Sequence, residues 1–289
     1  MKGKTHEIKV RRKIPPSAQS MKFKNRSYRY NVLDYNTKPK PPQKADERKN
    51  QSAMSQNEKD KFIAAYNAVN SSGELGIMVL YHADMTHMMH SNMGSTGTQR
   101  FLPWHRVYLA ELEDLLQAID TDITIPYWDW TVDETIPTWL QSFTPTVPLS
   151  GTIPPGMPNP VVVSRTPGLN IADLPPQQDV DTAMAKTDFT PFTYGLETGS
   201  FDPTQPEFQT GMHDQVHVWV GGTMGRIPTA PADPMFWMHH ANIDRIWSLW
   251  QKQNPGKNPT LAGPQATMDP WTATEEQTRD TLNFGYIYV

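Results

Sequence analysis

The 289-residue chain contains no cysteine, and this absence narrows the chemistry that it can perform. Without thiols it can have no disulfide, no cysteine nucleophile and no thiolate-ligated metal site. Any transition metal must therefore be bound by His, Asp, Glu or Met side chains. The absence leaves the cellular compartment open, because a cysteine-free protein tolerates either redox state.

Long apolar runs and a strong net charge are absent as well. No stretch approaches the roughly 18 apolar residues of a membrane-spanning helix, so no membrane is expected as a partner. The net charge is −4 with both signs interspersed, which argues against nucleic-acid binding. Arg11-Arg12 precedes Lys13-Ile-Pro-Pro16 rather than an apolar stretch. We therefore expect no signal peptide, and both a cytoplasmic location and export with a partner stay open.

Proline-rich sequence separates an N-terminal arm from the rest of the chain. Residues 14–54 are rich in Pro, Lys, Asn and Ser, and Lys38-Pro-Lys-Pro-Pro42 is typical of extended polyproline II segments. Helical periodicity begins at Ser55, which forms a capping-box pattern with Glu58. We therefore predict an extended arm over residues 1–54 and one catalytic domain over residues 55–289.

Apolar periodicity predicts a mainly α domain with a four-helix bundle core. Helices are expected to begin at Ser55, near Glu74, just before Pro103, near Thr210 and at Asp233-Pro234. Residues 131–206 are dominated by Pro, Thr and Gly with weak periodicity. They predict long irregular loops with few short strands.

Histidine is concentrated in two clusters. Eight of the nine histidines fall in them, and the ninth, His6, is interpreted as a solvated residue. The clusters contain His82, His87, His90 and His105, and His213, His217, His239 and His240. Imidazoles from two helices on each side of a bundle could hold two metal ions. A set without cysteine suits copper, and also zinc, iron or nickel.

The second cluster can be interpreted from its spacing. His213 and His217 are four residues apart, so a helix places both rings on one face. The next helix adds His239 or His240, and only one of them can join, because adjacent helical residues point about 100° apart. Periodicity leaves both open, although His240 shares its face with apolar residues. The pair also resembles the zinc-protease HExxH pattern with Asp214 in place of Glu, but a zinc hydrolase leaves the first cluster unexplained.

Several segments around the histidines form distinctive motifs: Phe101-Leu-Pro-Trp-His-Arg106, Pro126-Tyr-Trp-Asp-Trp130, and residues 213–222, 228–234 and 239–247. These segments resemble the tyrosinase family of type-3 copper proteins, most of all its short bacterial members. The first two resemble the copper-A half of the family, and the other three resemble the copper-B half. The similarity covers roughly residues 55–289. It implies a dinuclear copper site in the bundle, with two copper ions (Cu-A and Cu-B) and dioxygen as the co-substrate.

The resemblance also implies which side chains bind copper. For Cu-B it implies the ligands His213, His217 and His240. For Cu-A it implies His82, His105 and one further histidine, either His87 or His90. The family usually places this ligand nine residues before the histidine of the Phe-Leu-Pro-Trp-His motif, but position 96 is Thr. We favour His90, because it is nearer to His105 in the sequence.

Four further residues match functional positions of the family. Glu197 and Asp214 are candidates for positioning a water molecule and deprotonating the phenol. Ile227 and Phe236 match positions that shape the substrate pocket above Cu-B. The residue after the first Cu-B ligand is often Asn in members that hydroxylate monophenols, whereas here it is Asp214.

The resemblance therefore implies a tyrosinase, a polyphenol oxidase that uses dioxygen to hydroxylate monophenols and oxidise diphenols to o-quinones. Its substrate would be a small phenol, and a copper chaperone is a candidate partner. The alternative is a catechol or o-aminophenol oxidase without monophenol hydroxylase activity. A haemocyanin-like oxygen carrier, which would bind dioxygen without turnover, is less expected.

Overall fold

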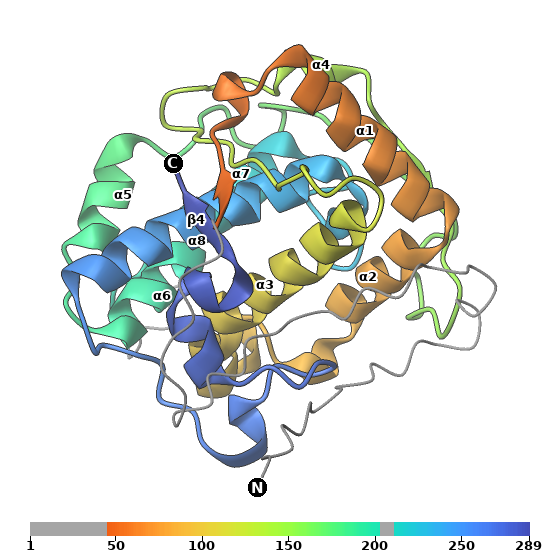
Figure 1. Cartoon of the computed structure of the whole chain (residues 1–289). Helices are drawn as coiled ribbons and strands as arrows, with labels where there is room; N and C mark the ends of the chain where they lie inside the picture. Colours follow the sequence, from red (N-terminus) through yellow and green to blue (C-terminus); the bar gives the residue numbers. More distant parts are fainter. Residues whose placement is uncertain (1–44, 203–210) are drawn as a thin grey trace, which may run out of the picture. The chain divides into compact units, whose positions relative to one another are not determined.

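The computed structural model describes residues 45–202 and 211–289, and this part of the chain is mainly helical (Figure 1). Its α-helices are α1 (Gln56–Ser71), α2 (Glu74–Ala83), α3 (Ser95–Gln117), α4 (Thr138–Gln141), α5 (Gln177–Met184), α6 (Phe189–Thr198), α7 (Met212–Val220) and α8 (Pro234–Gln253). Its short strands are β1 (Asp46–Arg48), β2 (Thr146–Val147), β3 (Val161–Val162) and β4 (Tyr286–Tyr288). The predicted fold class, mainly α with few short strands, is confirmed.

Two helices begin where their capping residues predict. At α1 the Ser55 hydroxyl accepts from the Glu58 backbone N–H at 3.3 Å, and the Glu58 carboxylate accepts from the Ser55 N–H at 2.7 Å. At α8 the Asp233 carboxylate accepts from the Met235 N–H at 2.9 Å, and Pro234 occupies the first helical position. Both arrangements satisfy N–H groups that a helix leaves unpaired at its start.

The prediction that the third helix begins just before Pro103 is wrong. Helix α3 begins two turns earlier, at Ser95, and Pro103 lies inside it. There the ring removes one backbone hydrogen bond of the helix. The first two turns lack an apolar stripe but are held by polar contacts of buried side chains. Gln99, for example, donates to the Thr190 hydroxyl on α6 at 2.8 Å.

The segment predicted as loops contains two helices that its sequence does not signal. Besides the short α4, β2 and β3, residues 131–202 include α5 and α6. Helix α6 has Pro191 in its first turn and Gly195 in its middle, which weakens its apolar pattern. A Cβ at Gly195 would lie 2.1 Å from the Phe201 ring, so tertiary packing selects this residue. Thr210, the predicted start of the fourth helix, lies outside the described residues.

The end of the predicted arm pairs with the C-terminal strand. Strand β1 is parallel to β4, with Asp46 opposite Tyr286 and Arg48 opposite Tyr288. The Arg48 side chain is fully buried and donates to Glu113 on α3 at 3.0 Å. Residues 45–54 therefore pack on the helical domain, whereas residues 1–44 of the predicted arm lie outside the described residues.

Helices α2, α3, α7 and α8 bring the two histidine clusters into the core. Figure 1 shows α3 crossing the middle of the domain, with α2 on one side and α6 and α8 on the other. The core between them is rich in aromatic rings, and six tryptophans are fully buried there: Trp104, Trp128, Trp130, Trp237, Trp247 and Trp250. Within the described ranges, no helix has the length and apolarity that crossing a membrane requires.

Candidate metal centre

Three histidines of the first cluster converge from two helices and a loop. His82 lies on α2, His105 lies on α3, and His90 lies in the loop between these helices. The Nε2 atom of His82 is 3.3 Å from that of His90 and 3.4 Å from that of His105. All three side chains are buried. Their ligand atoms form one group that could hold a metal ion.

The second cluster converges in the same way from α7 and α8. The Nε2 atom of His240 is 3.2 Å from that of His213 and 3.3 Å from that of His217. His239 also lies within 4.8 Å of these atoms, but its Nε2 donates to the His213 carbonyl at 3.1 Å. Its ring is stacked on His213 and packs against Trp130. The geometry therefore favours the three predicted Cu-B ligands, with His239 as their neighbour.

The two clusters adjoin each other. The rings of His105 and His240 are stacked with their centroids 4.4 Å apart and 13° between their planes. The His90 and His213 rings are 6.3 Å apart. Two imidazole triplets that lie more than 100 residues apart in the sequence thus form one continuous site.

The donor set fits two metal ions. The Nδ1 atoms of His82, His105 and His217 contact the backbone carbonyls of Ile227, Phe101 and Met224 at 2.8–2.9 Å. Because a carbonyl only accepts, each Nδ1 carries the proton and each Nε2 directs a lone pair into the cluster. The lone pairs of His82 and His105, whose Nε2 atoms are 3.4 Å apart, repel unless a cation lies between them. A tetrahedral ion with metal–nitrogen bonds of about 2.0–2.1 Å separates its ligand nitrogens by about 3.3 Å, which matches this spacing.

Burial keeps the imidazoles of five residues neutral: His82, His105, His213, His217 and His240. Burial, followed by the proximity of other histidines, lowers the pKa of His82, His105 and His240 well below the ordinary value. Burial also lowers the pKa of His213 and His217 to about 3. Neutral imidazole is the form that binds a metal ion, so these side chains need not lose a proton first at neutral pH.

His87, the alternative Cu-A ligand, does not join the cluster. Its Nδ1 is hydrogen-bonded to the Asp269 carboxylate, and its ring is stacked on Trp104 at 6.0 Å. Arg100 donates both to the His87 carbonyl and to Asp269, which holds the loop in this position. Of the two alternatives left open by the sequence, the geometry favours His90.

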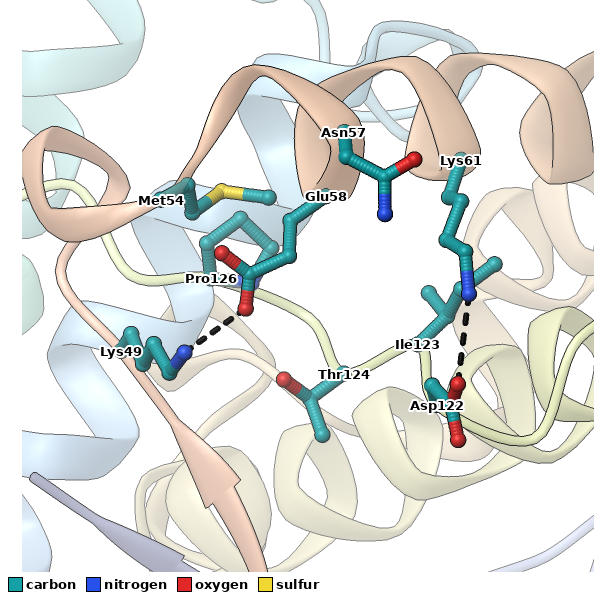
Figure 2. Close-up of a pocket in the computed structure, with 9 residues that line it drawn as sticks. All are labelled: Lys49, Met54, Asn57, Glu58, Lys61, Asp122, Ile123, Thr124 and Pro126. Carbon is teal, nitrogen blue, oxygen red and sulfur yellow. Dashed lines mark hydrogen bonds and ion pairs between the residues drawn. The ribbon is translucent and has the colours of Figure 1, made fainter.

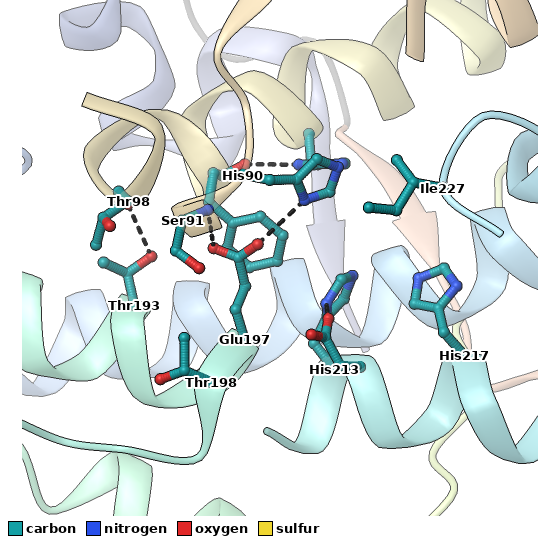
Figure 3. Close-up of polar contacts among 12 residues, drawn as sticks. His90, Ser91, Thr98, Thr193, Glu197, Thr198, His213, His217 and Ile227 are labelled. Carbon is teal, nitrogen blue, oxygen red and sulfur yellow. Dashed lines mark hydrogen bonds and ion pairs between the residues drawn. The ribbon is translucent and has the colours of Figure 1, made fainter. Parts of the chain in front are cut away.

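The two carboxylates predicted to act on water or phenol both contact histidines. Figure 3 shows the contact between Glu197 and His90. Glu197 is buried on α6, and its two oxygens accept from His90 Nδ1 at 3.1 Å and from the Ser91 N–H at 3.0 Å. Asp214 accepts from His213 Nδ1 at 2.7 Å, with half of its side chain exposed. Each carboxylate therefore orients an imidazole in this structure.

The two predicted pocket residues differ in exposure. Ile227 is 38% exposed, and its carbonyl is the acceptor for His82. Phe236 is fully buried, with its ring 4.1 Å from that of His240 and 5.0 Å from that of His82. It therefore supports imidazoles of both clusters.

Phe101 is a site residue that the sequence reasoning missed. Its ring is 4.8 Å from His213 and 5.0 Å from His105, and its carbonyl accepts from His105. A signal for this role was present, because Phe101 precedes His105 by one helical turn in the Phe-Leu-Pro-Trp-His motif.

A polar pocket elsewhere on the surface has no comparable donor set (Figure 2). It lies between the start of α1 and residues 122–126, and no histidine lines it. Its side chains form ion pairs with each other, Lys49 with Glu58 at 2.7 Å and Lys61 with Asp122 at 3.2 Å. The histidine clusters are therefore the stronger candidate for the functional site.

Comparisons with known proteins agree with this geometry. The sequence profile of the common central domain of tyrosinase matches residues 77–154 and 155–253. The tyrosinase of Streptomyces antibioticus is 32% identical over 256 residues, which span 78% of this chain and 93% of that protein. The chain belongs to the tyrosinase family.

Solved structures show the same fold. A tyrosinase from Burkholderia thailandensis superposes with a TM-score of 0.66 at 17% identity, covering 85% of this chain and 73% of that one. A functional unit of octopus haemocyanin superposes with a TM-score of 0.61 at 22% identity, covering 84% of this chain and 68% of that one. This tyrosinase-family chain is thus a type-3 copper protein and an enzyme of the tyrosinase class, and its two histidine groups could hold the two coppers.

Proposed function

We propose that this protein uses dioxygen to hydroxylate monophenols and to oxidise diphenols to o-quinones. The observation that carries the proposal is the pair of adjoining imidazole triplets with Nε2 atoms 3.2–3.4 Å apart. The proposed ligands of Cu-A are His82, His90 and His105, and those of Cu-B are His213, His217 and His240. When bound there, copper would supply the redox chemistry that links oxidation of the phenol to reduction of dioxygen.

The reaction balances with dioxygen as the only oxidant. Two catechols and one dioxygen give two o-quinones and two waters. One monophenol and one dioxygen give one o-quinone and one water, because one oxygen atom enters the ring. The protein holds a proton on the Nδ1 atoms that face carbonyls and keeps bulk water away from the buried imidazoles. Ile227 would border the approach of a small phenol, and Phe236 would hold the His240 ring against it.

The alternative is a catechol or o-aminophenol oxidase that lacks monophenol hydroxylase activity. It is favoured by the contacts of the two candidate bases. Both oxygens of Glu197 accept hydrogen bonds from the His90 loop, and one oxygen of Asp214 accepts from His213. Of the two carboxylates, only the half-exposed Asp214 has an oxygen that accepts no hydrogen bond from the described residues. Deprotonation of a monophenol would therefore depend on Asp214.

Oxygen uptake by the copper-loaded protein tests these functions in parallel with tyrosine and a catechol. Uptake with both substrates supports the proposal, and uptake with the catechol alone supports the alternative. Reversible oxygen binding without turnover would identify a carrier. Protein that binds zinc in preference to copper, measured by mass spectrometry, would refute a dicopper enzyme.

A copper chaperone is a further proposed partner. All the proposed ligands except the partly buried His217 are buried, so copper must enter through packed side chains. Loading of the metal-free protein with copper salt alone is expected to be slow and incomplete. Rapid binding of two copper ions per chain, followed by mass spectrometry, would show that no chaperone is needed.

A further inference from the structure

Of the six proposed ligands, all of which lie in described parts of the chain, only His90 is outside an α-helix. It lies between two short 3-10 turns, η3 (Met85–His87) and η4 (Ser91–Met93). The loop also contains Met88 with a left-handed backbone conformation, φ 51°. A loop residue lacks the hydrogen-bond ladder that fixes a helical side chain, so its imidazole needs another constraint.

Glu197 supplies such a constraint from a different helix. One oxygen accepts from His90 Nδ1 at 3.1 Å and the other from the Ser91 backbone N–H at 3.0 Å. Figure 3 shows this carboxylate reaching from α6 to the two consecutive loop residues. It therefore fixes both the ring of His90 and the backbone beside it. The side chain is only 5% exposed, so water competes little for these bonds.

The backbone of Glu197 connects this loop to the other half of the site. Its carbonyl accepts from the N–H of Gly211, the N-cap of α7, at 3.0 Å. A Cβ at Gly211 would lie 2.4 Å from the Glu197 carbonyl carbon, so the two backbones are in close contact. Helix α7 carries His213 and His217. One residue thus touches the loop of one histidine triplet and the start of the helix of the other.

We propose that Glu197 is a positioning residue that fixes His90 as a copper ligand, instead of acting on water or substrate. This inference rests on the proposed function, because it assumes that His90 binds copper. The Nδ1 atoms of His82, His105 and His217 contact backbone carbonyls, and that of His213 contacts the half-exposed Asp214. The buried Nδ1 of His240 has no hydrogen-bond partner among the described residues. Glu197 is the buried carboxylate that orients an imidazole here and raises its strength as a metal donor.

Copper binding tests the proposal with three variants, Glu197→Ala, Glu197→Gln and the matched control Thr193→Val. Thr193 lies one turn earlier on α6, and its hydroxyl donates to the Thr98 carbonyl on α3 at 3.3 Å instead of to the His90 loop. Loss of an outer hydrogen-bond partner typically weakens metal binding about 10- to 100-fold. In the presence of a chelator, the copper content of Glu197→Ala is expected to fall from two ions per chain towards one, as in His90→Ala, while Thr193→Val keeps two. Glu197→Gln retains one of the two hydrogen bonds of Glu197, so its copper content is expected to lie between those of Glu197→Ala and wild type.

A measurement on the metal-free protein tests the same contact without copper. Hydrogen exchange of peptides covering residues 85–93 is expected to speed up in Glu197→Ala, because the Ser91 N–H loses its acceptor, and not in Thr193→Val. A wild-type protein that binds no copper would refute the proposed function. The exchange result would still test whether Glu197 holds the loop of His90. Unchanged exchange and copper retention in both Glu197 variants would overturn the inference. Loss of catechol oxidation with both quantities unchanged would overturn it too, because Glu197 would then act on substrate or water.

Discussion

Replacing Asp244 with alanine is expected to destabilise the metal-free protein strongly. This buried carboxylate on α8 accepts from Arg106 at 2.6 Å, and from the hydroxyls of Tyr286 and Tyr288 at 2.6 Å each. Arg48 lies 3.7 Å away. Burial, and then Asp244, raise the pKa of Tyr286, so its hydroxyl keeps the proton that it donates. The variant would leave two fully buried guanidinium groups without this partner.

The magnitude follows from the burial of these charges. Removing one partner of a buried ion pair typically costs about 3–5 kcal/mol. For a domain of this size each kcal/mol lowers Tm by about 2–4 °C, so a fall of about 6–20 °C is expected. The assay is thermal unfolding followed by circular dichroism.

Asp188→Ala provides a matched control for this prediction. Asp188 pairs with Lys257 at 2.8 Å, but more than half of each side chain is exposed, so the expected cost is below about 1 kcal/mol. Tyr286→Phe should cost about 1.5–3 kcal/mol, because it removes a hydrogen bond to a charged group. Its effect should shrink when Asp244 is already alanine. A Tm of Asp244→Ala equal to that of Asp188→Ala would refute the reasoning.

Three further predictions concern separate parts of the chain. His90→Ala should reduce bound copper from two ions to one by mass spectrometry, while His87→Ala should retain two, and the reverse outcome would contradict the proposed ligand set. Ser55→Ala removes the capping hydroxyl of α1 and should cost about 1 kcal/mol, measured by denaturant unfolding, with no change in copper content. The hydrogen bonds from Lys49 and Ser55 lower the pKa of Glu58 from 4.5 to about 2. Its stabilisation is therefore complete above pH 4.5 and is lost as the pH falls towards 2. The stabilisation from this ion pair should stay below about 1 kcal/mol, because about a third of the Lys49 and Glu58 side chains is exposed to solvent. Lys49→Met should reduce the slope of stability against pH in this window, and an unchanged slope would refute the assignment.

The sequence predicted those parts of the site that local patterns encode. His213 and His217 share one helical face because of their spacing, and Asp233-Pro234 predicted the start of the helix that carries His240. The residues of the Phe-Leu-Pro-Trp-His motif placed His105 on α3. These assignments needed only the helical period and capping chemistry.

The remaining features depend on tertiary contacts that periodicity does not report. The start of α3 is polar and buried, and it is held by bonds such as that from Gln99 to Thr190. The choice between His87 and His90 depends on Asp269, which lies about 180 residues later in the chain and binds His87. The role of Glu197 depends likewise on a loop more than 100 residues earlier. No local pattern contains either partner.

The distance between the two histidine triplets is set by how α3 packs on α8. His105 and His240 are stacked at 4.4 Å, and each belongs to a different triplet. Arg106, the residue after His105, and Asp244, one turn beyond His240, are joined by a buried ion pair. The ring of Phe236 on α8 also lies 6.4 Å from that of His105 on α3. Because these contacts hold the same two helices, a change in the packing of α3 on α8 would alter the separation of the two triplets before it altered the geometry within either one. The proposed oxidation would need both triplets to act together, so this helix interface is as much a part of the function as the ligands themselves.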